Sequence, residues 1–329
     1  MSIGTSGSPP TTELNPEGIA DRTTVGVFFG QAARYGDRAL VHHLVGEQWK
    51  TETWADMKRY VLAVASALVD GGVKQGERVI LLGENRYEWL VADFGIQAAG
   101  GVSVPVYTGT APEVIQKIVD NSEAVLAIAS TDSLAGKLRV DGTLKKIVTI
   151  DTDVTAWMVR RPQRLPDVAT RLAAVKPDDL CTIVYTSGTT GDPKGVELAH
   201  RCLVDISRAA LKVFPLSDSD VTLSFLPYSH VFERINGVFI GLLFGGQSWI
   251  SRGVEHLGAE VIDSARDPRL AAEEQADEDA VDSLEHVRVR KKRQRHVRVA
   301  ERKHLQRSAA DVDQAAMREL DALGIAGGA

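Results

Sequence analysis

Short apolar runs alternate with amphipathic stretches from about residue 24 to residue 250, and this pattern predicts an α/β fold. Five runs indicate buried strands, at residues 78–82, 102–107, 124–129, 146–150 and 181–186. Stretches with helical spacing cover residues 87–99 and 112–120 between them. The runs are continuous and rich in β-branched residues, which is typical of strands covered on both faces. The repetition of strand, helix and strand predicts a parallel, doubly wound sheet that binds ligands at the carboxyl ends of its strands.

An earlier stretch, residues 51–70, carries apolar residues at helical spacing and is predicted to be a helix. Thr53 is a suitable N-cap, and Asp56 lies three residues further on, where a capping box places its acidic partner. The helix is expected to end at Gly71 and Gly72.

The last part of the chain, residues 251–329, has a different composition. No aromatic residue follows Trp249, and seven acidic residues within 273–285 precede ten basic residues within 288–307. Blocks of like charge stay solvated, and this segment has little apolar surface to bury. The sequence therefore predicts a polar N-terminal segment (1–23), a folded region (24–250) and a charged tail (251–329). The tail is expected to be disordered or translated out of frame.

Charge and cysteine content narrow the class of protein. The net charge is −6, whereas nucleic-acid-binding proteins carry basic surfaces, so no nucleic-acid partner is expected. A basic arm in the tail that binds nucleic acid or anionic lipid is the rival interpretation, although 251–329 holds fourteen basic and sixteen acidic residues. A chain with only two cysteines suits a reducing compartment. The pair His42-His43 has no further metal-ligating residues nearby in the sequence, so no metal site is assigned. With no secretory signal and no apolar run of spanning length, we expect a cytoplasmic protein; peripheral membrane contact is compatible with this.

One segment, YTSGTTGDPKG at 185–195, has the composition of a phosphate-binding loop. The predicted strand 181–186 ends at Thr186, which begins a run of six small or hydroxylated residues: Thr186, Ser187, Gly188, Thr189, Thr190 and Gly191. Glycines let the backbone N–H groups approach an anion, and Lys194 adds a positive charge. At 4 Å from a phosphate oxygen, that charge is worth roughly 4 kcal/mol at an effective dielectric constant of about 20, before desolvation. The loop matches neither the Gly-x-x-x-x-Gly-Lys-Ser/Thr motif of nucleoside triphosphatases nor the Gly-x-Gly-x-x-Gly motif of dinucleotide-binding proteins. A helix is expected to follow from about Ala199.

The same loop resembles the signature of the adenylate-forming acyl-CoA synthetases, the AMP-binding superfamily. Residues 76–107 and 225–246 are similar to neighbouring parts of that family. The string Pro-Tyr-Ser-His-Val-Phe-Glu-Arg at 227–234 resembles the long-chain fatty acid branch. The resemblance implies part of the family's large N-terminal domain, built from parallel sheet layers with helices.

The resemblance also implies a two-step reaction with ATP, Mg²⁺, coenzyme A and a fatty acid. The carboxylate attacks the α-phosphate of ATP, and the thiol of coenzyme A then displaces AMP. By family analogy Lys194 and His230 are the catalytic candidates, Lys194 and the loop residues 186–191 bind the nucleotide, and no metal-ligating residue is assigned. The family's Tyr-Gly-x-Thr-Glu motif, its ribose-binding Gly-Asp motif and its C-terminal lysine are absent from this sequence. We therefore expect a truncated and inactive chain of a long-chain fatty acid–CoA ligase. The alternative is a non-catalytic remnant that binds nucleotide or serves as an interaction module.

Simpler structural interpretations remain for single residues. His230 can be a satisfied loop histidine, and Glu233 with Arg234 can be an ordinary surface pair. Tyr185 is expected in core packing, and Trp89 as a buried anchor of its helix rather than a ligand contact.

Overall fold

The computed structural model describes residues 21–186, 192–214, 216–253 and 256, all within the unit Met1–Ser264. Of the predicted polar segment only residues 21–23 are described, and of the predicted charged tail only 251–253 and 256. Both predicted boundaries therefore stay predictions. Among the described residues, no helix combines the length and apolar content needed to cross a membrane.

A six-stranded sheet forms the larger layer, with the strand order β6-β5-β3-β4-β7-β8. Its strands are β3 (Arg78–Leu82), β4 (Val102–Val106), β5 (Leu126–Ala129), β6 (Lys146–Thr149), β7 (Leu180–Thr186) and β8 (Lys194–Ala199). Strands β3 to β7 pair in parallel, whereas β8 pairs antiparallel with β7. The predicted α/β class and the five predicted strands are confirmed. The strand β8 was not predicted, because its first residues carry the composition of a loop.

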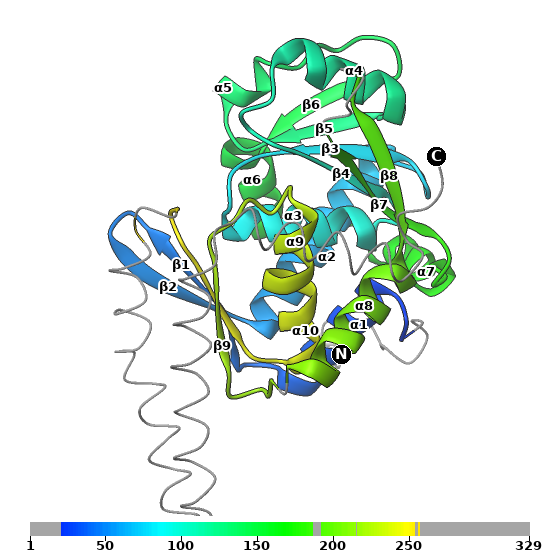
Figure 1. Ribbon diagram of the computed structural model, residues 1–329. Coiled ribbons are helices and arrows are strands. Elements are labelled where there is room, and N and C mark those ends of the chain that lie inside the picture. The colour runs from blue at the N-terminus through cyan, green and yellow to red at the C-terminus, as the bar shows by residue number, and fades with distance from the viewer. Residues whose placement is uncertain (1–20, 187–191, 215, 254–255, 257–329) are drawn as a thin grey trace, which may run out of the picture. The chain divides into compact units, whose positions relative to one another are not determined.

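The side chains of β3 show how this sheet separates two cores. Val79 and Leu81 pack into the cluster that contains α2 (Trp54–Asp70) and α3 (Tyr87–Ala98). Ile80 and Leu82 belong to the cluster with α4 (Pro112–Ser122) and α5 (Asp132–Ala135). Successive side chains of a strand point to opposite faces, so a continuous apolar run fills both cores. Figure 1 shows α4 and α5 over one face of the sheet and α2 and α3 over the other.

The helix α2 begins three residues later than the sequence pattern indicated. Residues 51–53 end the strand β2 (Gln48–Thr53), and Trp54 is the first helical residue. The predicted capping box is confirmed: the Thr53 hydroxyl accepts from the Asp56 N–H at 3.0 Å, and the Asp56 carboxylate accepts from the Thr53 N–H at 3.2 Å. The helix ends at Gly71, as expected.

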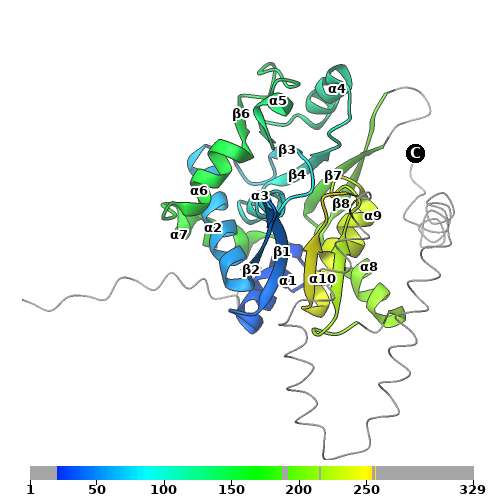
Figure 2. The ribbon, with the colours of Figure 1, turned by 90° about the vertical axis from the view of Figure 1, so that its left-hand side faces the viewer.

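A second sheet has the order β2-β1-β10-β9, with β1 (Ala39–Val45), β9 (Val221–Ser224) and β10 (Gln247–Ile250). Strands β1 and β2 form an antiparallel hairpin, and β10 pairs in parallel with both β1 and β9. The blue strand β1 therefore lies beside the yellow β10 in Figure 2. His42 is buried at this junction, and its ring bonds to Gln247 on β10 at 2.7 Å and to Thr51 on β2 at 2.9 Å.

Further helices flank and connect the two sheets. They are α1 (Thr24–Tyr35), α6 (Thr155–Val159), α7 (Leu165–Ala174), α8 (His200–Val213), α9 (Val231–Glu233) and α10 (Ile240–Phe244). Two π-helical segments, η2 (Ile150–Val154) and η3 (Arg234–Phe239), complete the described elements. The helix α8 starts one residue after the predicted Ala199, and Thr23 caps α1 by accepting from the Gly26 N–H at 3.0 Å.

Candidate functional site

The predicted phosphate loop joins the strands β7 and β8. Thr186, the last residue of β7, pairs directly with Lys194, the first residue of β8, so the structure brings these two predicted site residues together. Ser187, Gly188, Thr189, Thr190 and Gly191 lie outside the described residues. Lys194 and Thr186 are both exposed. The two ends of the loop are thus fixed by a strand pair at the carboxyl end of β7.

The β7–β8 hairpin is attached to α4 by two polar contacts. The Tyr185 hydroxyl donates to the Asn121 side-chain oxygen at 2.5 Å, and Lys117 forms an ion pair with Asp192 at 2.5 Å. This Lys117 contact holds the pKa of the Asp192 carboxyl below its usual value. Tyr185 is half-buried and packs against the core on the α4 side. Both Lys117 and Asp192 are exposed, so solvent screens their attraction.

The neighbouring strand β4 ends at the same edge of the sheet as β7. Ser103 on β4 pairs with Thr182 on β7, and the two strands run in parallel. Counting four residues along each strand places Tyr107 level with Thr186, at the carboxyl edge. This is the edge at which open α/β sheets bind their ligands.

A cleft of about 170 Å³ opens where the carboxyl ends of both sheets meet. It is lined by residues that follow β3, β4, β9 and β10, namely Gly83, Glu84, Asn85, Tyr107, Thr108, Phe225, Pro227, Ser251, Arg252 and Gly253. Most of them lie in the segments 76–107 and 225–246 that resemble the family, and Pro227 begins the string at 227–234, but none was named as a site residue. The lining residues that follow β3 and β4 could have been found, because ligands bind just after the strands of such a sheet. Those that follow β9 and β10 could not, because these two strands were not predicted.

Hydrogen bonds fix the walls of this cleft. The Asn85 amide donates to the Leu226 carbonyl at 2.6 Å and accepts from the Tyr228 N–H at 2.8 Å. Asn85 therefore ties the loop after β3 to the loop after β9. Elsewhere in the lining, Lys137 donates to the Thr108 carbonyl at 2.7 Å. Because both parts of the lining are held by bonds between loops of different strands, the cleft is largely formed before a ligand arrives.

His230 lies one turn beyond Pro227, which lines the cleft. Its backbone N–H donates to the Pro227 carbonyl at 2.9 Å, and its side chain is exposed. The ring Nδ1 accepts from the Phe232 N–H at 3.2 Å, so His230 caps the short helix α9. In a neutral imidazole this acceptor role puts the proton on Nε2. His230 thus offers an Nε2–H donor next to the cleft.

The alternative that Glu233 and Arg234 form an ordinary surface pair is wrong, because both side chains are buried. Arg234 is 1% exposed and binds Asp93 on α3, with Nη2 at 2.9 and 2.8 Å from the two carboxylate oxygens. Its Nη1 donates to the Thr182 hydroxyl on β7 at 2.8 Å. Trp89 is fully buried, as predicted, and its ring lies 5.8 Å from the guanidinium. The pairing partners come from elements far apart in sequence, so no local pattern indicated them.

Glu233 has a different environment from Arg234. It is 4% exposed, and its Oε1 has no hydrogen-bond partner in the part of the chain that the structure describes. Burial raises the pKa of Glu233 to about 7. The carboxyl group is therefore protonated more readily than an ordinary glutamate.

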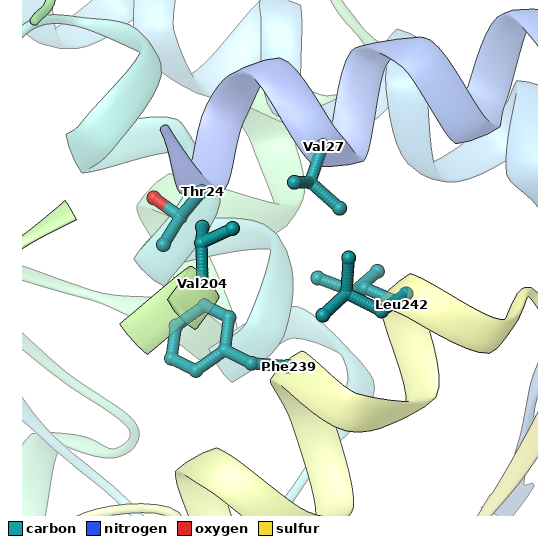
Figure 3. Close-up of a pocket in the computed structure, with 6 residues that line it drawn as sticks. Thr24, Val27, Val204, Phe239 and Leu242 are labelled. Atoms are coloured by element: carbon teal, nitrogen blue, oxygen red, sulfur yellow. The ribbon is translucent and has the colours of Figure 1, made fainter. Parts of the chain in front are cut away.

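A second cavity, between α1, α8, η3 and α10, is too small to hold a substrate. Its volume is about 10 Å³, roughly the space of a single water molecule. Figure 3 shows Val27, Val204, Phe239 and Leu242 around it, with Thr24 as the one labelled side chain that carries oxygen. It is a packing gap in an apolar helix contact.

Comparison with known proteins places these features in a family. The profile of the family described as AMP-binding enzyme matches residues 28–266. The long-chain-fatty-acid–CoA ligase FadD15 of Mycobacterium bovis is 34% identical over 209 residues, which cover 60% of this chain and 35% of FadD15. The long-chain-fatty-acid–CoA ligase ACSBG2 of Gallus gallus is 28% identical over 282 residues, covering 79% of this chain and 37% of that protein. The chain thus spans little more than a third of the length of these relatives.

A solved structure shares the fold. The fatty acyl-adenylate ligase from L. pneumophila, in complex with acyl adenylate and pyrophosphate, matches with a TM-score of 0.61 at 23% identity. The match covers 76% of this chain and 43% of that chain. The predicted fold, part of the N-terminal domain of adenylate-forming enzymes, is therefore confirmed.

Proposed function

Because this chain belongs to the AMP-binding enzyme family, we propose that it carries the phosphate-binding loop and the acyl-adenylate cleft of a long-chain fatty acid–CoA ligase. The observation that supports this most directly is the pairing of Thr186 with Lys194, which closes the loop at the same sheet edge as the cleft. In the proposed first step, a carboxylate oxygen of the fatty acid attacks the α-phosphate of ATP, and the bond to pyrophosphate breaks. In the second step, the thiol of coenzyme A attacks the acyl carbonyl, and AMP leaves.

Each candidate residue has a role that suits its place in the fold. Lys194 offsets the negative charge of the leaving pyrophosphate, together with the N–H and hydroxyl groups of residues 186–191. The Nε2–H of His230 donates to an oxygen of the acyl adenylate beside the cleft. These roles stay proposals, since they come from family analogy and position.

Mg²⁺ enters this proposal as a part of the ATP complex, held by the phosphates. The described residues contain no group of three His, Cys, Asp or Glu side chains that could hold a metal ion. Mg²⁺ bound by phosphates and water needs few protein ligands. Cytoplasmic location and peripheral membrane contact likewise remain predictions.

The test separates binding of the phosphates from binding of the acyl adenylate. The affinities of the whole chain for Mg²⁺–ATP, for AMP and for a non-hydrolysable long-chain acyl-adenylate analogue would be measured by calorimetry. We expect Lys194→Ala to weaken ATP binding about tenfold or more, and AMP binding little, because a charged hydrogen bond contributes about 1.5 to 3 kcal/mol. Lys146→Ala is the matched control, because Lys146 is also exposed and also starts a strand, at the opposite edge of the sheet.

Two outcomes decide the proposal. If ATP binds equally to wild type and Lys194→Ala, the loop assignment is wrong. If ATP binds but the long-chain analogue binds no better than AMP, the chain is the alternative, a nucleotide-binding module without an acyl site. Fatty-acid-dependent exchange of pyrophosphate into ATP would be followed in parallel. Measurable exchange would correct the expectation that the chain is inactive.

A further inference from the structure

The guanidinium of Arg234 joins the two segments that carry the candidate site. One segment is β7, which leads into the phosphate loop; Thr182, which accepts from Arg234, lies four residues before Thr186. The other segment is the run α9–η3, in which Arg234 follows His230 by four residues and donates its backbone N–H to the His230 carbonyl at 3.1 Å. Arg234 therefore links the two segments: its backbone belongs to the His230 segment, and its buried guanidinium bonds to β7.

His230 lies at the start of a helical run, as the N-cap of α9. The elements α9, η3 and α10 follow one another without a break from Val231 to Phe244, and η3 is a π-helical segment within this run. The side chain of His230 is exposed and packs into no core. Asn85 anchors the chain before His230, because it accepts from the Tyr228 N–H at 2.8 Å, and Arg234 anchors the chain after it.

The partners of Arg234 are themselves fixed. Asp93 accepts from the Gln97 amide at 3.0 Å on the same helix, and the Thr182 hydroxyl donates to the Ser103 carbonyl on β4 at 2.7 Å. The guanidinium also lies 5.7 Å from the ring of Phe239. Because the planar fork of arginine reaches both partners at once, its geometry sets the separation between η3 and β7.

From these contacts we propose that Arg234 is a positioning residue, which through Asp93 and Thr182 holds His230 in register with β7 and its last residue, Thr186. The expected effect of Arg234 on ligand binding rests on the proposed function. The expected effect of Arg234 on the position of His230 relative to β7 does not. The rival interpretation is that the ion pair only stabilises the fold. The two interpretations differ in what happens when the bond to β7 is removed and the ion pair is kept.

The decisive pair of variants is Thr182→Val and Thr182→Ser. Valine keeps the branched shape but removes the hydroxyl that accepts from Arg234, whereas serine keeps that hydroxyl and removes the methyl group. Two readouts would be compared: the affinity for the long-chain acyl-adenylate analogue relative to ATP, and the distance distribution between spin labels at positions 197 and 230. The labels would be attached through Glu197→Cys and His230→Cys in a Cys202→Ser background. Cys181 is buried, and burial raises the pKa of its thiol to about 12, so it does not react with the label.

We expect Thr182→Val to broaden or shift the distance distribution between the two spin labels. It should lower the affinity for the acyl-adenylate analogue about tenfold and change the affinity for ATP by less than about threefold. Thr182→Ser should restore both readouts toward wild type. If Thr182→Val leaves the distance distribution and the ratio of affinities unchanged, Arg234 is a structural residue only and the proposal is wrong.

A second variant covers the case in which Thr182→Val fails to fold. In Asp93→Leu/Arg234→Met, apolar side chains replace the buried pair, a change that often leaves stability intact. We expect a folded protein with a broadened distance distribution, and an unchanged distribution would again overturn the proposal. If the wild type binds neither ligand, the proposed function fails while the distance measurement still decides the role of Arg234.

Discussion

The two segments of the candidate site are held in opposite ways. The β7–β8 hairpin carries the phosphate loop and is attached to α4 by exposed polar contacts, such as the pair of Lys117 and Asp192. The α9–η3 segment carries His230 and is attached through Arg234, which is buried and paired with Asp93. An exposed ion pair contributes little to stability. Removing one partner of a buried ion pair destabilises the fold strongly, because the other charge stays buried without a partner. Breaking an exposed contact of the hairpin should thus cost the fold little, whereas breaking the buried pair at Arg234 should cost it much.

The largest effect should come from Asp93→Ala. This change leaves the Arg234 guanidinium buried without its carboxylate, and we expect a loss of about 3 to 5 kcal/mol in the free energy of unfolding. Urea denaturation followed by circular dichroism would measure it. Asp192→Ala, which breaks the exposed pair of the hairpin, is the control and should leave the midpoint unchanged. Equal losses for the two variants would remove the contrast between the segments.

A pH-dependent effect of intermediate size is expected at Glu233. Burial raises its pKa from 4.5 to about 7, so between these values the folded chain keeps a proton that the unfolded chain releases. The stability associated with Glu233 is therefore greatest below pH 4.5, falls as the pH rises toward 7, and stays low above it. Glu233→Gln should then stabilise the protein by up to about 3 kcal/mol at pH 8 and by little at pH 4.

Thermal unfolding of both proteins across this pH range would test the Glu233 prediction. The exposed Glu197→Gln serves as the control, with no expected change in the pH dependence. A Glu233→Gln variant that follows the wild-type pH profile would show that the carboxyl is ionised in the fold.

The smallest effect concerns packing in the hairpin. A Cβ atom on Gly195 would lie 2.8 Å from Ile183 Cγ2 and 3.0 Å from the Tyr185 ring, so Gly195→Ala overpacks this site. Because these neighbours are side chains on β7, next to the edge strand β8, and can shift by a few tenths of an ångström, we expect a loss of about 1 kcal/mol. Gly30→Ala is the matched control, because a Cβ there would meet no atom within 4 Å beyond its chain neighbours and its own helix backbone. Alanine in a helix should raise stability by about 0.5 to 1 kcal/mol. Differential scanning calorimetry would give both shifts, and a stabilised Gly195→Ala would contradict the packing geometry.

Strands with an uninterrupted apolar run could be recognised from the sequence. The buried strand β1, which His42 and His43 interrupt, and the half-exposed strands could not. The run at β3 is continuous and apolar because each of its faces meets a core, so length and composition identify it. The strands β9 and β10 are four residues each, and β9 is mostly exposed or half-exposed, which leaves too little pattern to recognise. The strand β8 is exposed along most of its length, and its Lys-Gly start reads as loop.

The candidate site was predictable to the extent that it is local in sequence. The loop composition located Thr186 and Lys194, and the antiparallel pairing of β7 with β8 then brings them together. The partners of Arg234 lie 141 and 52 residues away in the chain. Such contacts depend on tertiary packing, and for that reason the surface interpretation of Arg234 failed.

The alternation of β3 between two cores has a consequence for inherited variation. Each of its side chains can be exchanged for a similar apolar one at modest cost, since only one pocket is altered. Loss of a single codon is a different event, because it turns every following side chain of the strand to the opposite face. In this region an in-frame deletion of one residue should be far more damaging than any conservative substitution, although it changes the composition less.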